Sequence, residues 1–149
     1  MNALATTTDR GTSARASQQS PASKLKDVSE LAGRSFLAVL FLLSGLGKVG
    51  AYGATAAYMS SVGLPGVLLP VVIATEVLGA LAVILGWQTR VTALLLAGYT
   101  LLTALVFHTN FADQIEMIMF LKNVSIAGAF LLLVANGAGS LSLDRRLAR

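Results

Sequence analysis

Residues Val67–Trp87 read VLLPVVIATEVLGALAVILGW, an apolar run with a single ionisable residue, Glu76, near its middle. A helix needs about 20 predominantly apolar residues to cross the hydrocarbon core of a bilayer, and this run has that length. Pro70 falls in its first turns, where a missing N–H matters least. Trp87 ends it, at a position suited to an interfacial aromatic side chain. The run predicts a transmembrane helix and decides the fold class.

Three further apolar runs flank it: Leu31–Val49, Val91–Thr109 and Ile115–Ala135. The first is long enough to span only if Arg34 and Lys48 extend to opposite interfaces. The chain of 149 residues is 55% hydrophobic and 12% charged. Soluble domains are about 45–50% apolar and about 25% charged, so the composition indicates a membrane protein. The lack of cysteine excludes structural disulfides, thiolate metal sites and CxxC redox chemistry within this chain.

The connections predict how the four helices are ordered. Trp87–Arg90 and Thr109–Gln114 are short, so the helices that they join must be adjacent and antiparallel. The longer Gly50–Gly66 segment has room for a short interfacial helix at Ala54–Val62, ended by Gly63. We therefore expect an all-α membrane protein, an antiparallel four-transmembrane-helix bundle with a short helix in its first outer loop.

The bundle is expected to occupy residues 31–144, between two polar tails. Residues 1–30 are rich in Ser, Thr, Ala and Gln without an apolar period, which predicts a disordered cytoplasmic tail. A short surface helix over Ser23–Glu30 is the alternative for its last part. Residues 145–149 are expected to form a basic cytoplasmic tail.

The orientation in the membrane follows from the basic residues, because cytoplasmic loops carry an excess of Lys and Arg. Nine of the eleven basic residues fall on the side that holds both termini, so both termini are predicted to be cytoplasmic. The net charge of +4 then reflects orientation and headgroup contact, and we expect no nucleic-acid partner.

Each helix carries a polar or ionisable residue toward the outer side of the predicted bundle. Such residues at membrane depth are costly and usually face the bundle interior. Glu76 is expected at roughly 15 Å depth and Lys122 at roughly 10 Å, which makes them the predicted ion pair. Lys48 and His108 are expected at the rim, and Asn123 with Glu116 would extend the cluster outward. A single His without Cys argues against a metal site.

Every member of this cluster also has a structural interpretation. Glu76 could be a protonated, hydrogen-bonded carboxyl, and Lys122 could be only its counter-ion. Lys48 could extend to the outer headgroups, and His108 could be an ordinary interfacial residue. Whether the Glu76 and Lys122 cluster is functional or structural stays open from the sequence alone.

The chain resembles the DoxX family over roughly residues 34–144. The resemblance is carried by Phe41–Lys48 (FLLSGLGK), Glu76–Gly79 (EVLG), Phe107-His108, Phe120–Asn123 (FLKN) and Gly139–Asp144 (GSLSLD), in this order. It implies a small, multi-pass, four-helix protein of the bacterial inner membrane. The family takes its name from a subunit associated with thiosulfate:quinone oxidoreductase, and other members are linked to redox or oxidative-stress complexes. The polar positions that match the family pattern are Lys48, Glu76, His108, Lys122 and Asn123.

Two functions of different classes follow. In the first, the chain is a membrane subunit of a redox-associated complex, with a pocket for a quinone or small anion in the outer half of the bundle. In the second, the buried charges are structural and the chain is a non-catalytic assembly or interaction partner of another membrane protein. Both functions leave a homo-oligomer open.

The sequence shows no flavin motif, haem-ligand pair or metal constellation. The isolated chain is therefore not expected to transfer electrons by itself, and a quinone is the one cofactor anticipated.

Overall fold

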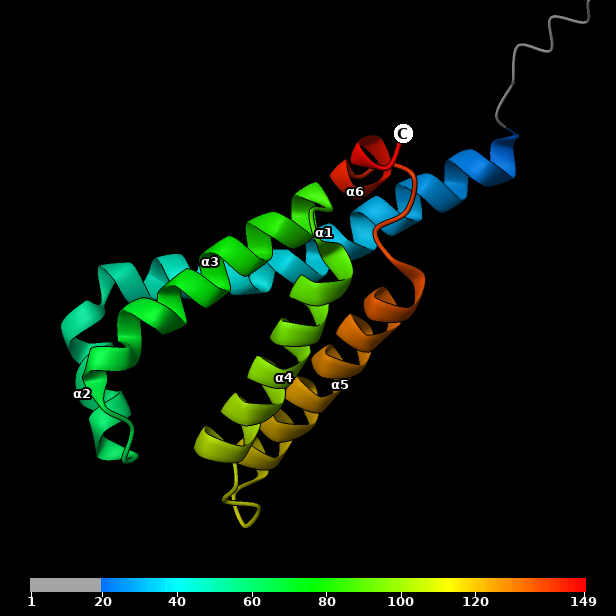
Figure 1. The fold of residues 1–149 in the computed structure, drawn as a ribbon. Helices are drawn as coiled ribbons and strands as arrows, with labels where there is room; N and C mark the ends of the chain where they lie inside the picture. The colour runs from blue at the N-terminus through cyan, green and yellow to red at the C-terminus, as the bar shows by residue number, and fades with distance from the viewer. Residues whose placement is uncertain (1–19) are drawn as a thin grey trace, which may run out of the picture.

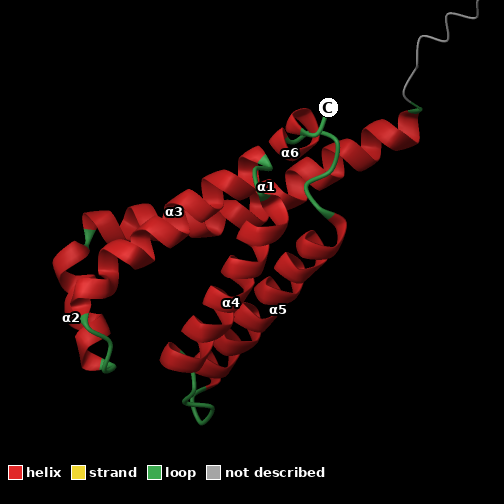
Figure 2. Cartoon of the chain, in the orientation of Figure 1, coloured by secondary structure: helices red, strands yellow, loops and turns green. Residues whose placement is uncertain are grey.

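The structure is a computed structural model that describes residues 20–149, and this part of the chain is built from helices joined by short loops (Figure 2). Four helices are long and apolar enough to cross a membrane, which confirms the predicted fold class. The elements in chain order are α1 (Pro21–Gly50), α2 (Tyr52–Ser61), the 3₁₀ turn η1 (Gly66–Leu68), α3 (Leu69–Leu85), α4 (Thr89–Phe107), α5 (Gln114–Asn136) and α6 (Leu143–Leu147).

Helix α1 begins ten residues before the apolar run that predicted it. Ser20 is its N-cap and accepts a hydrogen bond from the Ser23 N–H, and Pro21 occupies the first turn. Both residue types favour a helix start. Residues 21–30, assigned to the tail from composition, are therefore helical, as in the alternative considered for Ser23–Glu30. At 1.5 Å per residue α1 is roughly 45 Å long, longer than a bilayer core of about 30 Å. Residues 1–19 of the predicted tail lie outside the described residues.

The other elements agree with the sequence to within a few residues. The short helix expected at Ala54–Val62 is α2, and Gly63 follows its end with φ +83°. Helix α3 ends at Gly86, whose φ of +69° lies in the left-handed region. Helix α4 begins three residues later, at Thr89, so the two helices are joined by a tight turn. The basic tail predicted at residues 145–149 is partly helical, because α6 extends through Leu147.

The four long helices form two pairs (Figure 1). Helix α1 packs along α3, and α4 packs along α5. The two pairs meet near α6 and separate toward α2 and the α4–α5 loop. The contact between α1 and α5 is small compared with the contact within each pair. The bundle is therefore joined at its α6 end, while its α2 end is more open.

The core lies where the pairs meet. Phe41 of α1 packs edge-on against Phe130 of α5, with ring centroids 5.3 Å apart, and Val83 and Leu96 are fully buried beside them. Most other large apolar side chains face outward: Leu43, Leu78, Leu95 and Leu132 are each more than half exposed. Contiguous exposed apolar surface on this scale is untypical of soluble monomers. These faces are suited to lipid.

Glycines allow the helices to approach closely at two points. A Cβ on Gly45 of α1 would lie 2.7 Å from Cγ2 of Val77 in α3. A Cβ on Gly79 of α3 would lie 3.0 Å from Cδ2 of Leu96 in α4. Small residues at such crossings let membrane helices pack at short range. The Gly45 contact places Lys48, one helical turn further along α1, beside Glu76.

The C-terminal segment folds back onto the α6 end of the bundle. Arg34 is 3% exposed and donates hydrogen bonds to the carbonyl oxygens of Ala138 and Leu141. The predicted extension of Arg34 to a membrane interface is therefore wrong. The physical reason is that five N–H donors on a buried guanidinium need acceptors. The carbonyls after α5 supply two of them.

Candidate functional site

The site is built around Glu76, the buried acid in the middle of α3. Its carboxylate accepts hydrogen bonds from Lys48 Nζ at 2.9 and 2.8 Å and from the Tyr99 hydroxyl at 2.6 Å. Lys48 Nζ also donates to Ser44 Oγ at 2.6 Å, one turn back along α1. The Glu76 side chain is 5% exposed and the Lys48 side chain 25%. This four-residue network, Ser44, Lys48, Glu76 and Tyr99, ties α1, α3 and α4 together.

The predicted pairing of Glu76 with Lys122 is wrong, because Lys48 occupies that position. Depth along the membrane normal made Lys122 a plausible partner, but depth does not say which helices are neighbours. Helix α1 packs along α3, whereas α5 packs along α4. Lys48 therefore turns inward to Glu76 instead of outward to headgroups, and Lys122 donates to Met119 Sδ at 3.0 Å on its own helix.

Tyr99 is the site residue that the sequence did not single out. It lies in the middle of α4, between Gly98 and Thr100, and is half-buried. A buried tyrosine hydroxyl usually finds a hydrogen-bond partner. The sequence could have indicated this contact, because Tyr99 lies in the middle of one predicted span and Glu76 in the middle of the span before it.

His108, just after α4, and Glu116, in the first turn of α5, form a second polar pair across the α4–α5 loop. His108 Nδ1 lies 2.7 Å from Glu116 Oε2, with both side chains partly exposed. His108 is the C-cap of α4, and its expected place at the outer rim of the membrane stays a prediction. The pair is separate from the network around Glu76. Within residues 20–149, no three His, Cys, Asp or Glu side chains gather where they could hold a metal ion.

A cleft of about 540 Å³ lies between the two helix pairs. It is lined mainly by apolar side chains of α1 to α5, and its volume is within the range of small-molecule sites. All five polar residues predicted from the sequence lie on its wall: Lys48, Glu76, His108, Lys122 and Asn123. The structure thus places them around one cavity, while their function stays a prediction.

An aromatic stack joins the two sides of this cleft at the α2 end. Tyr58 of α2 and Phe107 of α4 lie with ring centroids 5.6 Å apart and an interplanar angle of 23°. Both residues line the cleft. Tyr58 thus contacts the last turn of α4.

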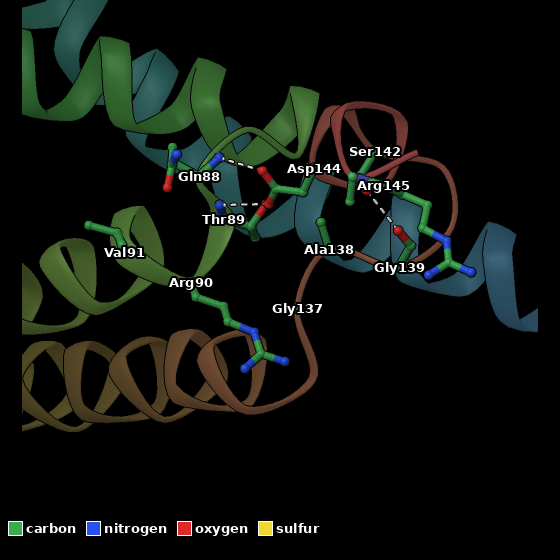
Figure 3. Close-up of a pocket in the computed structure, with 11 residues that line it drawn as sticks. Gln88, Thr89, Arg90, Val91, Gly137, Ala138, Gly139, Ser142, Asp144 and Arg145 are labelled. Atoms are coloured by element: carbon green, nitrogen blue, oxygen red, sulfur yellow. Dashed lines mark hydrogen bonds between the residues drawn. The ribbon is translucent and has the colours of Figure 1, made fainter.

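A second cavity, of about 480 Å³, lies at the α6 end (Figure 3). Here the Asp144 carboxylate accepts hydrogen bonds from the backbone N–H groups of Gln88 at 2.7 Å and Thr89 at 2.9 Å. Gln88 is the N-cap of α4, and its own side chain makes no capping hydrogen bond. Asp144 therefore caps α4 from the far end of the chain. Figure 3 shows Arg90 and Arg145 extending away from this carboxylate.

Burial alone would raise the pKa of Asp144. The hydrogen bonds from Thr89 and Gln88 and the charge of Arg34 outweigh it, and the pKa lies below its ordinary value. The carboxylate is therefore ionised at neutral pH and bound to the positive end of the α4 dipole. The cavity at the α6 end is therefore part of a structural contact, in which the C-terminal segment closes over the start of α4.

The comparisons with known proteins agree with this fold. The DoxX family model matches residues 29–109. The chain is 48% identical to the inner membrane protein YqjF of Escherichia coli over 124 residues, which cover 83% of this chain and 95% of that protein. It is 43% identical to the inner membrane protein YphA of the same organism, over 78% of this chain and 88% of that protein. No solved structure matches the chain. With four helices suited to span a membrane, the chain is a multi-pass inner-membrane protein that belongs to the DoxX family.

Proposed function

We propose that this chain is an inner-membrane subunit of a quinone-linked redox complex and that it binds the quinone ring in the cleft between the two helix pairs. One observation carries the proposal. The cleft combines about 540 Å³ of mostly apolar volume with a buried polar network at Glu76 and further polar side chains on its wall. Sites for small amphiphiles have this composition, an apolar wall with a few placed polar groups.

The cleft fits a quinone in size and polarity. An aromatic ring would lie against apolar side chains such as Val72 and Phe107, with its polar oxygens toward the Glu76 network and the α5 side chains Lys122 and Asn123. A bound quinone would supply the electron and proton uptake that side chains of this chain lack. The residues of the chain would orient the ring and exclude water. The electrons would come from a partner subunit.

The proposal includes an orientation. If both termini are cytoplasmic, as the distribution of Lys and Arg predicts, then α2 and the α4–α5 loop face the outer side. The cleft then lies in the outer half of the bundle, with the His108 and Glu116 pair near the aqueous edge. A lipid-soluble ligand can reach it from the bilayer, because the contact between α1 and α5 is small.

The proposal is tested by the quinone content of the protein purified in mild detergent from native membranes. Val72→Trp fills the cleft from α3, and we expect it to lower the copurifying quinone at least tenfold. Leu78→Trp is the matched control, because Leu78 is on the same helix but 64% exposed on the outer face. Quinone absent from the wild-type protein, or retained equally in both variants, contradicts the proposal.

A second candidate is a non-catalytic assembly partner in which the buried charges only hold the helices together. The specific observation in its favour is that Glu76 is satisfied from within the chain, by Lys48 and Tyr99. In that case the wide apolar surfaces of α4 and α5 would contact another membrane protein or a second copy of this chain.

Crosslinking in native membranes separates the two candidates. The assembly function predicts a stoichiometric partner, captured equally by the wild type and by the cleft-filling Val72→Trp variant. It also predicts that Glu76→Gln lowers thermal stability and partner capture together. A partner that is lost only when the cleft is filled supports the quinone-linked function instead.

A further inference from the structure

We infer that the deep end of the cleft selects a neutral ligand that donates hydrogen bonds, so that among quinones it binds the reduced, hydroxyl-bearing quinol in preference to the oxidised quinone. This inference rests on the proposed function for the class of ligand. The preference itself comes from a count of donors and acceptors on the cleft wall.

Most donors of the Glu76 network are already used. Lys48 has three N–H donors, and they bind Ser44 Oγ and both carboxylate oxygens of Glu76. The single O–H of Tyr99 binds Glu76 Oε1. Neither Lys48 nor Tyr99 therefore has a proton left for a ligand carbonyl. What the network still presents is lone pairs, on the Tyr99 oxygen and the Glu76 carboxylate, and a single hydroxyl proton, on Ser44.

The threonines of the cleft wall add further acceptors. Each of the four donates its hydroxyl proton to a backbone carbonyl of its own helix: Thr55 to Ala51, Thr75 to Val71, Thr100 to Leu96 and Thr103 to Thr100, at 2.7 to 3.0 Å. A threonine hydroxyl has two acceptor lone pairs in addition to its proton. With the protons spent on the helices, these oxygens can only accept.

The charge of the network points to a neutral ligand. Lys48 and Glu76 cancel, so the deep end has no net charge to offer to an ion. An anion could bind Lys48 only by displacing Glu76, which would leave a buried carboxylate unpaired, and this is strongly unfavourable. The small-anion alternative is therefore not favoured at this end of the cleft.

A quinone and its quinol differ in what they offer to such a wall. The quinol hydroxyls find many acceptors, whereas a quinone carbonyl has one donor to bind, the Ser44 hydroxyl, and elsewhere on this wall is left buried among lone pairs without a partner. A buried polar group without a partner typically weakens binding by roughly tenfold to a hundredfold. The remaining side-chain donors, on Tyr58, His108, Lys122 and Asn123, lie on α2, on the α4 C-cap and on α5. They could serve the far oxygen of either redox form equally.

The experiment compares the two forms of one probe on the full chain in detergent. Binding of decyl-benzoquinone and of its hydroquinone, kept reduced under anaerobic conditions, is measured by calorimetry. We expect the hydroquinone to bind at least tenfold more tightly. Thr103→Val removes a wall acceptor and should weaken hydroquinone binding severalfold while leaving the quinone unchanged. Thr92→Val, on the same helix but away from the cleft, is the matched control.

Equal or tighter binding of the quinone to the wild type overturns this inference and leaves the proposed function intact. Binding of neither form, together with no copurifying quinone, overturns both.

Discussion

Side chains from α1, α3 and α4 meet at the Glu76 carboxylate, and this contact is the feature on which the rest of the site depends. Lys48 and Tyr99 satisfy the carboxylate from α1 and α4. An ionised acid in an apolar bundle is tolerated only when it is paired and hydrogen-bonded. The network therefore determines both how the helices are held and what polar groups the cleft can present.

Breaking the pair from either side should be costly. We expect Glu76→Gln and Lys48→Met each to lower the free energy of unfolding by about 2–4 kcal/mol, because each leaves one charge unpaired. The lower part of the range applies because the Lys48 side chain is 25% exposed. Unfolding in mixed detergent micelles measures the change. The double variant should lose clearly less than the sum of the two; additive losses would show that the two charges do not stabilise each other.

Gly86 has a backbone conformation that other residues rarely adopt. Its φ is +69°, and a Cβ there would lie 2.5 Å from the Cβ of Ser142. Gly86→Ala should therefore destabilise the protein by more than the roughly 1–2 kcal/mol of left-handed strain alone. Gly98→Ala on α4 is the control, because nothing lies within 4 Å of that position. It should be neutral or slightly stabilising, and equal thermal shifts for the two variants would contradict this account.

The sequence could predict which residues are costly to bury, but not which of them would meet. Glu76, Lys48 and Lys122 stand out because charge is rare in apolar runs. The choice of Lys48 over Lys122 depends on α1 packing along α3, and this pairing depends on the fit of Gly45 against Val77. Shape complementarity of this kind is not readable from hydropathy.

Among the elements, the segment after α5 has the most specific structural task. It returns to the turn between α3 and α4, where Asp144 caps α4 and Arg34 holds the carbonyls of Ala138 and Leu141. The backbone N–H of Asp144 also donates to Gly86 at 2.8 Å. The segment joins α1, α3 and α4 at the end where the two helix pairs converge.

The contact of this C-terminal segment with the start of α4 should depend on pH. The pKa of Asp144 is lower in the folded chain than its ordinary value of 3.8. Its contribution to stability is therefore complete above that value and is lost as pH falls through the lower, folded-state pKa. A spin label at Leu147 should stay immobile from pH 7 down to pH 4 and become mobile only below the ordinary value of 3.8. In Asp144→Asn it should already be more mobile at pH 7; a pH profile identical to that of the wild type would exclude Asp144 as the cause.

At the level of elements, the apolar runs predicted α3, α4 and α5 within a few residues, because hydrophobic length fixes a span. The start of α1 was missed by ten residues. Its signals, Ser20 and Pro21, lie in a polar segment where hydropathy carries no information. A search for capping residues, independent of hydropathy, would have found it.

At the scale of the whole molecule, two helix pairs converge at one end and separate at the other (Figure 1). Loop lengths correctly predicted the antiparallel order of the helices. They contain no information on the angle between the pairs, and that angle creates the cleft. The sequence predicted a pocket and the five polar residues that line the cleft, but the size and shape of the cleft depend on this angle and could not be predicted.

The predicted orientation can be measured directly. Alkaline phosphatase is active only outside the cytoplasm. Fused after Arg149 it should be inactive, and inserted at Gly63 in the α2–α3 loop it should be active. A green fluorescent protein at the same two positions should give the opposite pattern. An active phosphatase at the C-terminus would place the cleft in the cytoplasmic half and contradict the orientation.

The central claim, that the cleft is a binding site, is tested most directly by photoaffinity labelling. A photoreactive quinol analogue is crosslinked to the protein in native membranes, and the labelled residues are identified by mass spectrometry. The account predicts labels on cleft-lining residues of α3 and α4, such as Val72, Tyr99 and Thr103, which excess unlabelled quinol suppresses and Val72→Trp abolishes. Labels confined to outward-facing residues such as Leu78 and Leu132, unaffected by competitor, would contradict it.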